Sequence, residues 1–111
     1  MEIVCNQGNL NNAIQLVSKA VASRPTHPIL ANILVTADEI TKKVSLTGFD
    51  LNLGIQTSFE ATVIKSGAIT IPSKLLSEIV NKLPNESPVS LIVSELSDNI
   101  LLKSDRGSFN L

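Results

Sequence analysis

An apolar helical pattern that occurs twice constrains the fold of this chain more than any other feature. Apolar residues spaced at i, i+3, i+4 and i+7 lie on one face of a helix. Two such sets are present: Leu10, Ala13, Ile14 and Val17, and then Leu76, Ile79, Val80 and Leu83. Each member of the second set lies 66 positions after its counterpart. The repeat indicates a weak internal duplication, with halves of about 1–65 and 66–111.

The segments around each helix show the alternation or the apolar runs that are typical of strands. Asn6 can cap the first helix by accepting a hydrogen bond from the backbone near Asn9, and Pro25 and Pro28 prevent its continuation. The first half is predicted to contain one strand before its helix and three after it, at 2–5, 29–36, 44–47 and 55–63. The second half repeats this order, with strands at 68–71, 89–93, 100–102 and 109–111.

Each half therefore has the order β-α-β-β-β. A chain of 111 residues fits a single domain with one core. Two amphipathic helices and several half-buried strands predict an α+β fold in which both helices pack on one side of a mainly antiparallel sheet.

Charge and cysteine content give weaker constraints. Nine Lys and Arg against ten Asp and Glu give a net charge of −1, which by itself argues against a nucleic-acid partner but does not describe how the charge is distributed. The single cysteine, Cys5, excludes an internal disulfide and suits a reducing compartment as a buried thiol. Because the N-terminus lacks the pattern of a signal peptide, we expect a cytoplasmic protein.

Catalytic and cofactor motifs are not recognisable. The only histidine, His27, has no nucleophile or orienting acid at a familiar spacing, and the carboxylates are scattered without metal-ligand spacing. Neither the phosphate-cradling nor the dinucleotide glycine motif occurs. We therefore expect no catalytic residues, no metal and no cofactor.

Arg24 is the strongest candidate for binding an anion. It follows the first helix and precedes Pro25, so its guanidinium is presented by a stiff loop and can bind a phosphate, or it can pair with a carboxylate. If the two helices line a channel around DNA, their polar outward faces meet the phosphate backbone. The candidates on those faces are Gln15, Lys19, Lys74 and Lys82.

Four blocks of the chain resemble the N-terminal domain of the bacterial DNA polymerase III beta subunit, the family of replicative sliding clamps. They include the loop Ser23-Arg24-Pro25-Thr26-His27-Pro28 and the segment Leu46-Thr47-Gly48-Phe49-Asp50-Leu51, and together they cover 23–32, 46–51, 71–84 and 103–111. The resemblance implies a DNA-clamp domain from a three-domain chain that forms a head-to-tail homodimeric ring around duplex DNA. A clamp loader would load this ring, which would tether the replicative polymerase as a non-catalytic processivity factor. The present chain would be the first domain alone, with the later clamp domains absent.

The resemblance also implies roles for single residues. Arg24 matches the DNA-contacting arginine of the family. Phe109 and Leu111 match an apolar pair on the edge strand that packs against the other subunit, with Arg106 nearby for ion pairing. Ser108 departs from the basic residue expected there.

Two other functions stay open on the residues alone. One is a small anion-binding or enzymatic domain that holds a phosphorylated ligand with Arg24, Thr26 and His27. The other is a protein-interaction scaffold that never meets DNA, for which the net charge is the best argument.

Overall fold

The fold combines two helices with nine strands in the residues that the structure describes. The structure is a computed structural model that describes residues 1–20, 32–49, 54–94 and 99–111. The elements run in the order β1 (Glu2–Asn6), α1 (Gln7–Ser18), β2 (Asn32–Asp38), β3 (Lys43–Phe49), β4 (Gly54–Glu60), β5 (Thr62–Lys65), β6 (Gly67–Pro72), α2 (Ser73–Asn81), β7 (Pro88–Val93), β8 (Ile100–Ser104) and β9 (Gly107–Asn110).

The strands form two antiparallel sheets. One has the order β5-β1-β7-β8-β9 and the other the order β4-β3-β2-β6. In each sheet, three consecutive strands of one half are joined by the first strand of the other half: β6 pairs with β2, and β1 pairs with β7. The predicted α+β class with antiparallel strands is confirmed, whereas the prediction of a single sheet is wrong. Alternation along a strand shows which face is buried but not which sheet the strand joins.

The segment predicted as one strand at 55–63 is divided at Ala61. β4 ends at Glu60 in the four-stranded sheet, and β5 begins at Thr62 in the five-stranded sheet. The backbone N–H of Ala61 donates to the carbonyl of Lys42 at 3.1 Å and not to either sheet. Because the inward and outward alternation continues through the bend, the sequence pattern does not reveal it.

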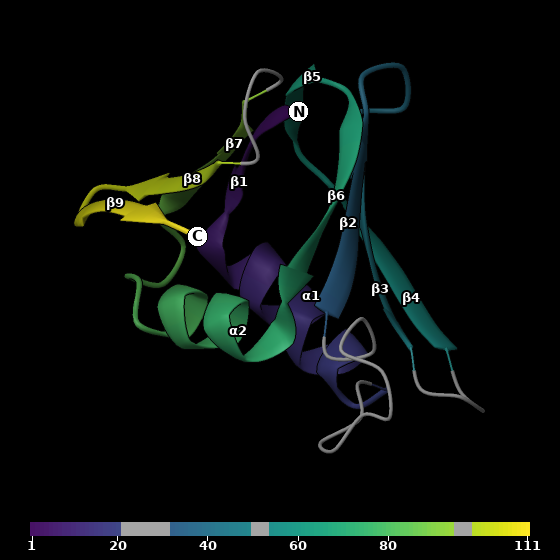
Figure 1. Ribbon diagram of the computed structural model, residues 1–111. Coiled ribbons are helices and arrows are strands. Elements are labelled where there is room, and N and C mark those ends of the chain that lie inside the picture. Colours follow the sequence, from purple (N-terminus) through teal and green to yellow (C-terminus); the bar gives the residue numbers. More distant parts are fainter. Residues whose placement is uncertain (21–31, 50–53, 95–98) are drawn as a thin grey trace.

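The two helices lie side by side on the same side of the molecule, and the sheets extend away from them (Figure 1). α1 packs against β3 and β4, and α2 packs against β6. The apolar set of each helix faces one shared core, and only Ile79 is partly exposed. The predicted placement of both helices on one side is therefore confirmed. Neither helix, over the part of the chain described, has the length and apolar character needed to cross a membrane.

Candidate nucleic-acid interface

The start of α1 is closed by side chains from both halves of the chain. As predicted, Asn6 caps the helix: its Oδ1 accepts from the N–H groups of Gly8 at 2.7 Å and Asn9 at 3.3 Å. Glu86 lies against the same turn, because its Oε2 accepts from Asn6 Nδ2 at 3.1 Å. A Cβ on Gly8 would approach Glu86 Oε1 to 2.7 Å, so glycine permits the close contact. A carboxylate here stabilises the positive end of the helix dipole.

The helices run antiparallel and are joined at both ends by buried polar side chains. Gln7 is 2% exposed, and its Nε2 donates to the carbonyl of Val80 at 2.8 Å. Ser73 is 6% exposed, and its hydroxyl shares a hydrogen bond of 3.2 Å with the hydroxyl of Ser18. Both residues begin their helices, and each contacts the last turn of the other helix. The two hydrogen bonds fix the relative position of the helices.

Gln15 lies on the exposed side of the contact between the two helices. Its side chain is exposed, and its Nε2 donates to the hydroxyl of Ser77 on α2 at 3.3 Å. The residue is accessible to a ligand, as the sequence predicted. It also links the helices, which the helical pattern of one segment cannot show.

The three predicted lysines are exposed and lie at two different ends of the helix pair. Lys19 follows α1 and Lys74 lies in the first turn of α2, so the contact between Ser18 and Ser73 brings these two lysines to one end. Lys82 follows α2 and lies at the opposite end. None of the three forms an ion pair with a residue of the described part of the chain. Their charges are therefore available to an external anion.

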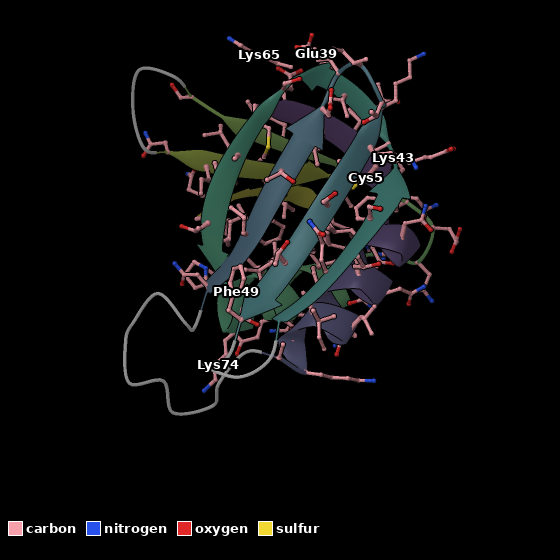
Figure 2. The ribbon with its side chains drawn as sticks, turned by 90° about the vertical axis from the view of Figure 1, so that its right-hand side faces the viewer. Cys5, Glu39, Lys43, Phe49, Lys65 and Lys74 are labelled. Carbon is pink, nitrogen blue, oxygen red and sulfur yellow. The ribbon has the colours of Figure 1, made fainter. Side chains whose placement is uncertain are left out.

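Arg24, Thr26 and His27 lie outside the described residues. The described chain stops at Ala20 after α1 and resumes at Asn32 in β2. Asn32 pairs in register with Pro72, the residue before α2. Both flanks of the predicted anion-binding loop are thus at the end of the molecule that carries Lys19 and Lys74; Figure 2 labels Lys74 at this end, with Glu39 and Lys65 at the other.

The predicted subunit border is the edge of the five-stranded sheet. β9 pairs only with β8 among the described strands, and all four of its residues are exposed. Phe109 was predicted to point inward but is 37% exposed, whereas Leu111 packs against the core and donates its N–H to the carbonyl of Ile100 at 2.9 Å. Arg106 is exposed in the turn before β9. An open edge with a half-exposed phenylalanine is typical of an interface strand.

A cation beside this border was missed by the sequence reasoning. Lys103 on β8 lies in register with Ser108 on β9, and it is exposed. Cross-strand neighbours lie close together on one face of a sheet, so Lys103 is positioned beside the serine where a basic residue was expected. The hairpin turn at Asp105 and Arg106 was the available signal for this pairing.

Cys5 is a core residue, as predicted. It is 6% exposed in β1. Burial raises the pKa of the Cys5 thiol from 9.0 to about 12, because a thiolate would lose its hydration there. Such a thiol is a poor nucleophile at neutral pH.

Comparison with known families identifies the family to which the chain belongs. The family model of the DNA polymerase III beta subunit, N-terminal domain, matches residues 1–111. The chain belongs to this family. It is 60% identical over 91 residues to the beta sliding clamp of Synechococcus elongatus, a match that covers 82% of this chain and 24% of that protein. It is 53% identical over 85 residues to the beta sliding clamp of a Synechocystis species, covering 77% of this chain and 22% of the relative.

Solved structures agree with this assignment and confirm the clamp fold. The DNA polymerase sliding clamp of Caulobacter crescentus superposes with a TM-score of 0.92 at 34% identity, over 100% of this chain and 30% of that one. A sliding clamp of Bartonella birtlesii, solved bound to griselimycin, gives a TM-score of 0.91 at 35% identity, over 100% of this chain and 29% of that one. The chain spans about a quarter of the length of the first two curated relatives.

Proposed function

We propose that this chain is the first domain of a bacterial sliding clamp, a ring that encircles duplex DNA and tethers the replicative polymerase in the cytoplasm. The domain occupies residues 1–111 and is built from duplicated halves of about 1–65 and 66–111. Membership of the beta subunit family and relatives named beta sliding clamp support this function. The protein acts as a processivity factor and does not itself catalyse nucleotide transfer.

The observation that carries the proposal is the helix pair with its exposed lysines. Lys19, Lys74 and Lys82 are exposed on or beside two helices whose shared surface is otherwise mainly polar and uncharged, as at Gln15. Arg24, which lies outside the described residues, follows Lys19 in the sequence and would add a guanidinium. These groups contact phosphates and read no base edges, so binding is independent of sequence.

Because these contacts are few and involve only phosphates, they allow the protein to slide along DNA and do not hold it tightly at one position. Each phosphate that is neutralised adds a salt-dependent contribution, and no contact fixes the protein at one base sequence. The closed ring encircles the DNA and therefore stays on the DNA without tight contacts. The net charge of −1 is compatible with this arrangement, since the cations of the helix pair would face the DNA and Glu78 is the one acidic residue within the two helices.

The subunit interface is proposed at β9. Phe109 and Leu111 supply the apolar contact and Arg106 an ion pair, while the free backbone groups of the edge strand can pair with a strand of the other subunit. The full-length protein would thus form a homodimer. The polymerase and the clamp loader bind the complete ring, and we assign them no residue of this domain.

DNA binding is tested in the full-length ring by its salt dependence. Replacing Lys74 or Arg24 with alanine should reduce the slope of log K against log salt by about 0.9 for each phosphate that is no longer neutralised. Lys43→Ala, an exposed cation on β3, is the matched control and should leave the slope unchanged. Slopes that are equal in the parent and all three variants would remove these residues from the DNA-binding site.

The interface is tested by substituting Phe109 with aspartate in the full-length protein. A buried, unpaired carboxylate at the subunit contact should shift the protein from dimer to monomer. Light scattering measures the mass, and Phe49→Asp is the control because Phe49 is also half-exposed but lies at the end of β3. A dimer that persists in Phe109→Asp would contradict the proposed border.

A further inference from the structure

Polar side chains without charge join the two helices along their line of contact. They are Gln7, Gln15 and Ser18 of α1 and Ser73 and Ser77 of α2. Gln7 and Ser73 are buried, whereas Gln15 is exposed and Ser77 is half-buried. The contact of Gln15 with Ser77 is therefore the part of this line that is most open to a ligand.

The hydrogen bond between Gln15 and Ser77 leaves donors unused. Gln15 Nε2 donates to Ser77 Oγ at 3.3 Å, so the serine oxygen is the acceptor and its own hydrogen takes no part in the contact. Within the described ranges, neither side chain forms another hydrogen bond. The second hydrogen of Gln15 Nε2 and the hydroxyl hydrogen of Ser77 are thus available to an acceptor outside the chain.

A lysine lies beside each of these two donors. Lys19 comes four residues after Gln15, and Lys74 comes three residues before Ser77. Residues at these spacings are neighbours on a helix surface. Both lysines are exposed, and the hydrogen bond between Ser18 and Ser73 holds them at the same end of the helix pair. Two ammonium groups and two neutral donors are therefore grouped on one surface.

Glu78 is the one carboxylate on the helices, and it lies off the line of contact. Successive residues of a helix are turned by about 100°, and Ser77 faces α1, so Glu78 is directed away from Gln15. Glu78 also comes four residues after Lys74 and four before Lys82, so an exposed lysine lies on either side of it. Glu86 lies at the opposite end, against the start of α1. The surface around Gln15 and Ser77 is thus positive in balance.

We propose that Gln15 and Ser77 donate jointly to one phosphate of duplex DNA, between the ammonium groups of Lys19 and Lys74. Phosphate oxygens accept hydrogen bonds and do not donate them, so they match the unused donors. The inference rests on the proposed function and adds Ser77, which the sequence analysis did not single out. A neutral donor neutralises no phosphate, so this contact adds affinity without adding to the salt dependence.

The test is the binding of the full-length ring to a short duplex at several salt concentrations, measured by fluorescence anisotropy. Ser77→Ala should lower the affinity by about three- to tenfold at each concentration. The slope of log K against log salt should stay that of the parent ring. If the serine only held the helices in place, its loss would displace Lys74 and reduce the slope.

Two further variants separate the shared contact from a general effect of substitution. Gln15→Leu removes the other donor, and the double variant with Ser77→Ala should lose less affinity than the product of the two single losses, because both donors serve one phosphate. Ser45→Ala is the control and should bind like the parent ring. Ser45 is also half-buried, but it lies on β3 between two residues that face the core.

Three results would overturn the inference: an affinity that Ser77→Ala leaves unchanged, a reduced slope in that variant, or single losses that multiply in the double variant. Circular dichroism verifies that each variant keeps its helices, and alanine favours them. A parent ring that shows no salt-dependent binding would contradict the proposed function itself. Failure of the neutral contact alone leaves that function standing.

Discussion

The two helices occupy equivalent places in the repeat, yet their starts differ. Asn6 and Glu86 close the start of α1, whereas Pro72 offers α2 no side-chain hydrogen bond, and the exposed Lys74 lies in its first turn beside the buried Ser73. Free N–H groups and a nearby cation favour an anion, and a bound carboxylate opposes one. The start of α1 is therefore occupied by its own cap, whereas the start of α2 has no side-chain cap and lies at the end that we assign to DNA.

The largest expected difference in stability comes from replacing the first residue of each helix. Gln7→Leu keeps the volume of the side chain but removes its buried hydrogen bond to the carbonyl of Val80, which keeps only the N–H of Leu83 at 3.2 Å, so the free energy of unfolding should fall by about 1.5 kcal/mol. Ser73→Ala, at the equivalent position, removes a hydroxyl whose partner Ser18 is only half-buried, and it should cost less than about 1 kcal/mol. Urea denaturation measures both. Equal losses would show that the two contacts are energetically alike.

Cys5 and Ile71 are the equivalent core residues that precede the helices, and only Cys5 can ionise. Its pKa is raised in the folded state to about 12, so the folded protein retains a proton that the unfolded chain releases above 9.0. Stability is therefore unaffected below pH 9 and falls as the pH rises from 9 to 12, by roughly 1 kcal/mol at pH 10. Thermal denaturation of Cys5→Val should lack this part of the pH dependence. An identical pH profile for both proteins would contradict the inference.

The cap of α1 gives the smallest expected effect. Asn6→Ala removes the acceptor for two backbone N–H groups and should lower the free energy of unfolding by about 1 kcal/mol. Asn9→Ala is the control, because its side chain is exposed and only its backbone takes part in the cap; a change within about 0.5 kcal/mol is expected. If the control is as unstable as Asn6→Ala, the cap is not what stabilises this helix start.

Local patterns predicted the helices, most strands, the Asn6 cap and the exposed lysines, because each depends on residues a few positions apart. The bend at Ala61, the division into two sheets and the contacts of Gln7 and Glu86 were not predicted. Gln7 and its partner Val80 are 73 positions apart, and Asn6 and Glu86 are 80 apart. Contacts at that separation depend on how the halves assemble, which a pattern within one segment does not encode.

The exchange of first strands between the halves has a consequence for unfolding. Separating the first half from the second would break the pairing of β1 with β7 and of β2 with β6 at the same time. Neither half can detach while its own sheet stays complete. A protein that is pulled or heated should therefore lose both sheets in one cooperative step, and a nick near residue 65 should leave two fragments that hold together until the whole assembly melts.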